Sequence, residues 1–382
     1  MRVAVSGSVL RWALQRSGRY AAIERKFPKL SEWLQHKSQP TLRQLEDLAK
    51  ATATPLGYFF LEEPPDVQLP IPYFRTLDED LAPYPSPNLL ETVQTMERRQ
   101  AWLREYLIEQ GHNPLSFVRS AKVTDDPRRV ARKMKDVLSL AEGWAARHPS
   151  WTAALRELQR KSEDAGILVV VNSIVGNNTR RKLSVSEFRG FVLVDEYAPL
   201  VFLNGADGKA AQMFTLAHEL AHVWLGSSAV FDLRELQPAA DEVEQACNRV
   251  AAEFLVPGDE MREVWSSVRY ESERFQQIAR RFKVSELVAA RRALDLRLIT
   301  RNEFLEFYQA YLENDRRANF PGREGGDFYA SQNLRIGQRF AEAVVCAVRE
   351  GRLLYHEAYQ LTGLYGKAFV RYAEFLLGGE QL

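Results

Sequence analysis

Two histidines four residues apart, His218 and His222, have the spacing in this sequence that most directly predicts chemistry. They lie in a run without proline or glycine, from Gln212 to Leu225, which predicts one continuous helix. Residues at i and i+4 project from the same helix face, so both imidazoles can bind one divalent ion at about 2.0–2.1 Å. Glu219 directly follows the first histidine and is placed to act as a general base on a water held by that ion.

A third ligand is needed, because a catalytic zinc usually has three protein ligands and one open position. The candidates are acidic residues of the next predicted helix, Ala239 to Phe254: Asp241, Glu242, Glu244 and Glu253. We choose Glu244, because its helix is otherwise made of small and apolar residues, where an acid is costly unless it is paired or bound to metal. Asn248, four residues later, shares its face and is predicted to orient Glu244 or a histidine ligand.

Strands are expected just before this helix. The apolar run Ile167–Val171 predicts one strand, and Phe188–Val194 and Leu200–Leu203 predict a hairpin joined by a short turn. The site helix is expected to begin near Asp207, and the chain is expected to loop from Ser227 to Pro238 after it. A peptide substrate would then lie along an edge strand of the small sheet, for which we choose Phe188–Val194.

Several further residues are weaker candidates. Arg189 and Tyr197 could donate a hydrogen bond to an oxyanion, although a structural role fits each of them better. Cys247 could report oxidation, but a small buried residue is the simpler interpretation. The remaining histidines have no partner pattern and are expected to be structural: His36, His112, His148 and His356.

The site residues and their neighbours resemble the ImmA/IrrE metallopeptidases, bacterial and phage enzymes related to the zincins. The resemblance covers most of the chain, and its most specific parts are Phe188–Phe191, Leu203–Asn204, Phe214–His222 and Glu244–Pro257. The metal-ligand Glu of the family stands four residues before the Asn of the last segment. That position is Glu244 here, in agreement with the choice made from the helix pattern. Val256 stands where Met is common in the family.

The N-terminal segment is basic, with ten Lys and Arg against four Asp and Glu in residues 1–61. Phe27–Leu34 followed by Gln39–Leu45 resembles the repressor-type (XRE, lambda-repressor-like) helix-turn-helix. Leu30–Gln35, which would be the recognition segment, is poor in side chains that read bases. DNA binding therefore stands beside a second interpretation, a degenerate helix-turn-helix kept for packing or for docking a protein partner.

The chain of 382 residues is expected to have an α+β fold that is predominantly helical. We expect five segments: a helix-turn-helix at 1–61, a proline-rich linker at 62–87, a zincin-like metallopeptidase domain at 88–258, a basic helical unit at 259–321 and a C-terminal helical module at 322–382. Within the fourth, Ile278–Val288 has the form of a second helix-turn-helix or of a packing hairpin. Gly322–Gly326 is expected to be a flexible break.

Bulk composition excludes several classes of protein. The net charge is +1, so any nucleic-acid role must be local. Two cysteines, Cys247 and Cys346, exclude a disulfide framework and fit a reducing compartment. No run of 18 apolar residues occurs, so we expect a soluble, cytoplasmic chain without a membrane partner.

The expected function is zinc-dependent endopeptidase activity, with Mn²⁺ as another possible ion. The resemblance implies a protein substrate of the helix-turn-helix repressor type, whose cleavage relieves repression of stress or mobile-element genes. The competing hypothesis is a DNA-binding regulator, or an antitoxin with a toxin partner, that uses the peptidase fold without proteolysis.

Overall fold

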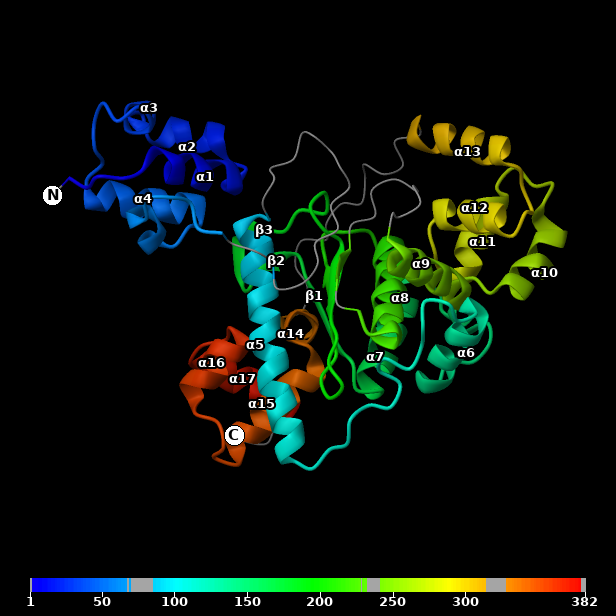
Figure 1. The fold of residues 1–382 in the computed structure, drawn as a ribbon. Coiled ribbons are helices and arrows are strands. Elements are labelled where there is room, and N and C mark those ends of the chain that lie inside the picture. Colours follow the sequence, from blue (N-terminus) through cyan, green and yellow to red (C-terminus); the bar gives the residue numbers. More distant parts are fainter. Residues whose placement is uncertain are drawn as a thin grey trace.

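The computed structural model describes residues 2–66, 69, 85–227, 229–231, 241–313 and 328–378. Most of these residues are helical, and a small sheet lies between two groups of helices (Figure 1). The predicted mostly helical α+β class is therefore confirmed. The expected linker lies largely outside the described residues, and the Gly322–Gly326 break lies wholly outside them.

The helices in chain order are α1 Gly7–Ser17, α2 Tyr20–Lys26, α3 Leu30–Leu34, α4 Leu42–Thr52, α5 Pro87–Glu109, α6 Pro127–Val137, α7 Trp151–Asp164, α8 Lys209–Leu225, α9 Glu242–Leu255, α10 Gly258–Val268, α11 Arg274–Phe282, α12 Glu286–Asp295, α13 Arg301–Glu313, α14 Phe328–Ile336, α15 Gln338–Arg349, α16 Tyr355–Thr362 and α17 Lys367–Leu376. Two short 3-10 helices are η1 Leu56–Phe60 and η2 Trp144–Arg147.

The main sheet has the order β1-β5-β4-β6, where β1 is Leu168–Asn172, β5 is Leu200–Asn204, β4 is Gly190–Leu193 and β6 is Ala229–Phe231. β1 is parallel to β5, and β4 is antiparallel to both β5 and β6. The first predicted strand and the predicted hairpin are confirmed. A separate small hairpin pairs β2 Ile174–Val175 with β3 Asn178–Lys182.

One prediction about the sheet is wrong. β4, within the predicted strand Phe188–Val194, is not an edge strand, because β6 pairs with its outer side. β6 lies in the segment Ser227–Pro238 that was expected to be a loop. Three residues next to a helix end give too short an apolar run to be distinguished from a loop by pattern.

Strands β1, β4 and β5 of the main sheet are buried on both faces, and their side chains alternate between two cores. Val169, Val192 and Val201 belong to one core with α6–α12. Leu168, Phe191 and Phe202 belong to the other, with α5 and α14–α17. Figure 1 shows α5 and the C-terminal helices on one side of the sheet and α7, α8 and α9 on the other. The sheet thus holds α8 at a fixed height above β4 and β5.

The buried Arg99 of α5 joins the C-terminal helices to the sheet layer. Its Nε donates to the carbonyl of Leu361 at 2.8 Å, and its Nη1 donates to the carbonyl of Arg335 at 3.0 Å. These carbonyls lie in the last turns of α16 and α14, where helix geometry leaves acceptors without partners. Because a guanidinium has several N–H donors, Arg99 can satisfy carbonyls at the C-terminal ends of both helices at once.

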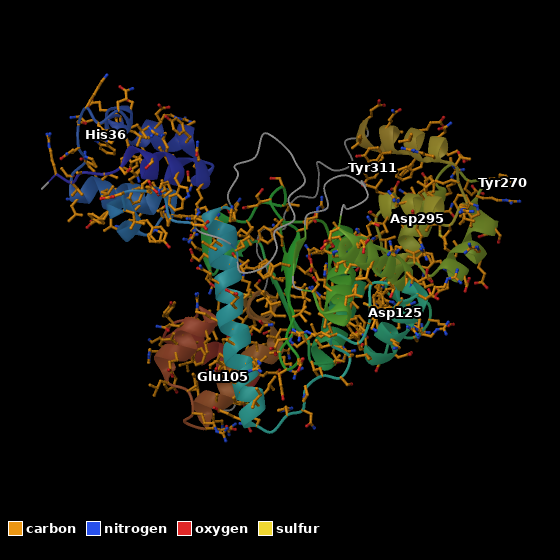
Figure 2. All side chains as sticks on the ribbon, in the orientation of Figure 1. His36, Glu105, Asp125, Tyr270, Asp295 and Tyr311 are labelled. Carbon is orange, nitrogen blue, oxygen red and sulfur yellow. The ribbon has the colours of Figure 1, made fainter. Side chains whose placement is uncertain are left out.

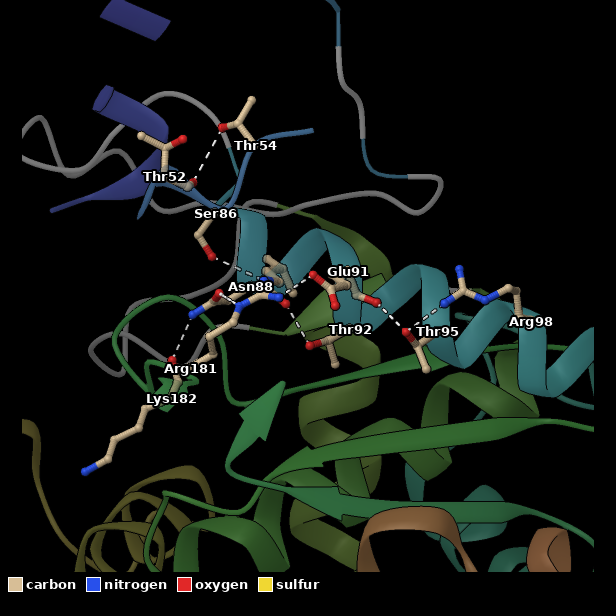
Figure 3. Close-up of polar contacts among 11 residues, drawn as sticks. Thr52, Thr54, Ser86, Asn88, Glu91, Thr92, Thr95, Arg98, Arg181 and Lys182 are labelled. Atoms are coloured by element: carbon tan, nitrogen blue, oxygen red, sulfur yellow. Dashed lines mark hydrogen bonds and ion pairs between the residues drawn. The ribbon is translucent and has the colours of Figure 1, made fainter. Parts of the chain in front are cut away.

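The start of α5 is tied to the β2–β3 hairpin (Figure 3). Ser86 caps the helix by accepting from the Leu89 N–H at 3.1 Å, ahead of Pro87 at its first position. Asn88 donates to the carbonyl of Lys182 at 3.0 Å and accepts from Arg181 Nε at 3.1 Å. The hairpin is therefore fixed to α5 by polar contacts.

The N-terminal helices α1–α4 have their own core, which includes Trp12, Leu30, Trp33 and Phe59. Thr41 caps α4 and forms a capping box with Gln44, as its sequence position predicts. Ser6 stands at the N-cap position of α1.

The segment α11–α12 has the predicted form of two helices around a short turn, with Lys283 in the left-handed conformation and Ser285 capping α12. Trp151 of α7 donates to the carbonyl of Val284 in this turn at 3.0 Å. Phe275 and Ile278 belong to the same core as the helices beside the sheet. These contacts are those of a packing hairpin.

In the described part of the chain, no helix combines the length and apolar character that crossing a membrane requires.

Glu163 provides a test of how the C-terminal helices dock. Burial, followed by the charge of Glu342, raises the pKa of its carboxyl from 4.5 to about 7. A raised carboxyl pKa contributes stability that is complete below pH about 4.5 and is lost as pH rises through about 7. We predict that Glu163→Gln removes a decline of about 1–3 kcal/mol in the free energy of unfolding between pH 5 and 8.

Denaturant unfolding at a series of pH values measures this difference. Asp164→Asn is the control, since Asp164 is exposed and pairs only with the exposed Arg160 among the described residues. An identical pH dependence in wild type and Glu163→Gln would contradict the prediction.

Candidate metal centre

Helix α8 carries the predicted histidines through the middle of the protein. Its residues from Gln212 to Trp224 are all buried, against the sheet on one side and α9 on another. Gly226 ends the helix in the left-handed conformation, with a φ of 81°, and its N–H donates to the carbonyl of His222 at 2.8 Å. A helix packed on all sides offers its polar side chains fixed positions, because they have no water to turn toward.

The structure brings together the three predicted ligands. His218 Nε2 lies 3.1 Å from His222 Nε2 and 3.1 Å from Glu244 Oε2, and His222 Nε2 lies 3.1 Å from Glu244 Oε1. An ion held tetrahedrally at about 2.0–2.1 Å places its ligand atoms about 3.3 Å apart. The three side chains therefore already have the separations of a tetrahedral site with one position left open.

The hydrogen bond at the far side of His218 decides which of its nitrogens is free. Its Nδ1 lies 3.0 Å from Asn248 Oδ1, an acceptor, so Nδ1 carries the hydrogen. Burial lowers the pKa of His218 to about 4, so the ring is neutral at pH 7. Its Nε2 lone pair then faces the carboxylate of Glu244. Two acceptors at 3.1 Å repel each other unless a cation lies between them, and this arrangement fits a metal ion.

The ionisation of Glu244 agrees with this. Burial alone would raise the pKa of its carboxyl. With a proton on the facing imidazoles, the hydrogen bonds and charges of His218 and His222 outweigh burial and hold that pKa well below its usual range, and a cation between the ligands supplies the same positive charge. Metal ligands must be a neutral imidazole and an ionised carboxylate, and His218 and Glu244 have these forms.

The other acidic candidates have different partners. Asp241 caps α9, accepting from the N–H groups of Val243 at 2.8 Å and Glu244 at 3.2 Å. Glu253 accepts from the Gly258 N–H at 3.1 Å and pairs with Arg292. Glu242 is exposed. Among the acids of α9, Glu244 is the one that reaches the histidines, and the Asp241 cap fixes the first turn that carries it.

Glu219 lies beside the three ligands and has no exposed surface. Burial raises the pKa of its carboxyl well above the ordinary value, and the charge of Glu244 raises it further. Neither of its oxygens has a hydrogen-bond partner among the described residues. An uncompensated buried carboxyl is costly, and its persistence at such a place is typical of a functional group.

Gly190 of β4 is a site residue whose role was not predicted from the sequence. A Cβ there would lie 2.6 Å from Thr215 Cγ2, 2.9 Å from the carbonyl of Phe202 and 3.3 Å from Glu219 Oε1. The missing side chain lets β4 approach α8 at the level of Glu219. The available signal was a glycine inside a strand, which often marks a close backbone approach.

The weaker candidates have structural partners. Arg189 pairs with Asp207 at 2.8 Å in the turn before α8. Tyr197 lies in the turn beyond the far end of β4, with the Arg104 guanidinium over its ring. Cys247 is fully buried, and burial raises the pKa of its thiol, so it is a poor nucleophile. His36 lies in the N-terminal helices, away from α8 (Figure 2).

Residues 162–294 match the family model Peptidase_M78, the IrrE N-terminal-like domain. The match contains all three predicted ligands, Glu219 and Asn248. It supports the ImmA/IrrE resemblance for this part of the chain and indicates a metallopeptidase-like fold. Residues 336–375 match a second model, described as a domain of unknown function (DUF8813). No curated protein matches the sequence well enough to count as a relative.

Substituting Asn248, which contacts His218 on the side away from the predicted metal, tests how it supports metal binding. Because its amide oxygen fixes the orientation and tautomer of His218, we predict that Asn248→Ala lowers metal affinity about 10–100-fold. Competition with a chromophoric zinc chelator measures the affinity. The neighbouring exposed residue provides the control, Arg249→Ala, which should leave the affinity unchanged. Equal affinities in all three proteins would contradict the assigned role.

Gly190 tests the close approach of β4 and α8. We predict that Gly190→Ala lowers the free energy of unfolding by about 1–3 kcal/mol through overpacking, and that adding Thr215→Ser recovers part of the loss. Gly57→Ala is the control, since a Cβ at Gly57 meets nothing within 4 Å in the described structure. Failure of Thr215→Ser to recover any stability would show that the contact with Thr215 is not the cause.

Proposed function

We propose that the chain is a zinc-dependent endopeptidase. The observation that carries the proposal is the convergence of His218, His222 and Glu244 at 3.1 Å beside a buried Glu219 that has no other described partner. When bound, a divalent ion supplies Lewis acidity toward a peptide carbonyl and makes a water easier to deprotonate. The family match, which is to a peptidase domain, points to the same activity.

Glu219 is the proposed proton carrier. Its raised pKa makes the ionised carboxylate a good proton acceptor, and positive charge beside it favours that ionised form. It would take a proton from the attacking water and later give it to the amine that leaves. His218, His222 and Glu244 hold their positions during these transfers, because Asn248 and the Asp241 cap fix two of them.

The proposed substrate is a regulatory protein of the helix-turn-helix repressor type. This follows from the ImmA/IrrE resemblance, in which well-known members cleave such repressors. The N-terminal helices, with their own core and excess of basic residues, are the proposed recognition unit for such a partner.

Replacing Glu219 distinguishes metal binding from peptide cleavage. We predict that Glu219→Gln keeps one bound zinc per chain and lowers cleavage of fluorescein-labelled casein at least ~100-fold, since Gln cannot accept the proton. Metal content and cleavage rate are measured on the same preparation. Glu242→Gln, an exposed acid of α9, is the control. Equal rates in wild type and Glu219→Gln would favour the alternative, a regulator or antitoxin that does not cleave proteins.

Two basic segments favour that alternative, the N-terminal segment and the Arg-rich residues 274–301. The turn of the second segment is packed against Trp151. However, α3, the candidate recognition helix, buries Leu30 and Trp33, and it directs Ser31 and Glu32 outward. Neither side chain gives the bidentate base contacts that Arg, Asn or Gln would, and the exposed Gln35 after the helix is the single side chain of this type in the segment Leu30–Gln35. We therefore propose that the unit docks a protein.

The full chain is accordingly predicted to bind duplex DNA without sequence preference and only at low salt. A filter-binding series across salt concentrations, with wild type and Arg25→Ala/Lys29→Ala, provides the measurement. Sequence-specific binding that persists at 150 mM salt and is lost in that variant would contradict this proposal.

A further inference from the structure

The outer edge of β4 is covered by a segment of the same chain. β6 follows α8 closely and runs antiparallel to β4, with Phe231 opposite Gly190, Val230 opposite Phe191 and Ala229 opposite Val192. It also contacts α8. β4 therefore pairs with β5 along one edge and with β6 along the other, so neither edge is free to pair with a further strand.

β6 pairs with β4 at the residue that approaches the candidate site. Gly190 of β4 lies close to Glu219, since an added Cβ would lie 3.3 Å from Glu219 Oε1. β6 crosses the outer edge at this same level, because Phe231 is the register partner of Gly190. A peptide that adds to a sheet edge uses the same main-chain donors and acceptors that β6 now uses.

The site is also closed. His218, Glu219 and His222 have no exposed surface, and Glu244 is 5% exposed. A peptide carbonyl cannot reach these side chains until part of the protein moves. β6 is joined to the sheet by three residue pairs, whereas β1 and β5 share five. Short edge strands are the parts of a sheet that open most readily.

We propose that β6 occupies the substrate-binding edge of β4 and that a substrate must displace it. The substrate then pairs with Gly190–Val192 as an extended strand in the direction of β6. This inference rests on the proposed peptidase function and specifies its substrate class. The sequence of β6, Ala229-Val230-Phe231, is uncharged and rich in strand-forming residues, so the preferred substrates are extended segments of that kind.

A reversible crosslink tests the displacement. Val192→Cys and Ala229→Cys are introduced together with Cys346→Ser, which removes the exposed native thiol. Register partners in antiparallel strands have Cα atoms about 4.5–5.5 Å apart, within the range of a disulfide. Diamide then locks β6 onto β4, and dithiothreitol releases it. The matched control joins Val192 to its register partner on the other side, as Val192→Cys with Val201→Cys.

Binding is measured first, on proteins that also carry Glu219→Gln. The probe is a fluorescein-labelled peptide with the sequence of residues 226–234, Gly-Ser-Ser-Ala-Val-Phe-Asp-Leu-Arg. The reduced 192/229 variant is expected to bind it, the oxidised form to bind at least tenfold more weakly, and reduction to restore binding. The 192/201 control should bind equally in both states. Absence of binding by the reduced form, or equal binding by the locked form, overturns the inference.

Cleavage is then measured with Glu219 intact and an internally quenched form of the same peptide. Binding that depends on the lock, without cleavage in either state, contradicts the peptidase function and leaves the edge assignment standing. Cleavage that the lock does not change overturns the edge assignment alone. The double variant Val230→Pro/Phe231→Pro is a second test. The N–H groups of successive strand residues point to opposite sides, so one of the two prolines removes a donor to β4 and opens the edge. This variant should bind the labelled peptide at least fivefold more tightly, and unchanged binding would oppose the inference.

Discussion

The Nε2 atoms of His218 and His222 and the carboxylate of Glu244 face one another at 3.1 Å in a region with almost no exposed surface. Electron-rich atoms at this separation are stable only with positive charge between them. Much of the surrounding structure can be understood as the means of keeping them there. Asn248 sets the tautomer of His218, and the Asp241 cap sets the first turn of α9.

The sheet fixes the position of α8, and so of its histidines, from the other side of that helix. Asn204, at the end of β5, donates its side-chain N–H to the carbonyl of Phe188 at 3.1 Å and accepts from the N–H of Ala206 at 3.1 Å. It thereby links the entry of β4 to the turn that leads into α8. Gly190 then allows β4 to lie against Thr215 and Glu219. The predicted ligands, Glu219 and Gly190 are thus held by a few short contacts between β4, α8 and α9.

Much of the centre could be predicted from sequence, because its signals are local. The i, i+4 histidines need only one uninterrupted helix, and Glu244 needs only the apolar pattern of the next one. Asn248 follows from its spacing to Glu244. The strands Leu168–Asn172 and Leu200–Asn204 are buried on both faces, so their continuous apolar runs were visible.

What could not be predicted depends on contacts distant in sequence. The close approach at Gly190 involves Thr215 of α8 and the Phe202 carbonyl, and no local pattern shows it. β6 is three residues long, and its pairing with β4 is a tertiary event. The C-terminal helices were expected as a separate module, and their domain boundary remains a prediction. In the structure they share a core with α5 and the sheet, partly through Arg99.

Zinc K-edge X-ray absorption of the metal-loaded full-length protein tests the central arrangement most directly. The account predicts one zinc per chain, two imidazole ligands at about 2.0–2.1 Å, oxygen for the remaining coordination and no sulfur. Failure to take up a stoichiometric divalent ion would contradict it. So would a sulfur shell at about 2.3 Å, which would place Cys247 rather than Glu244 on the ion.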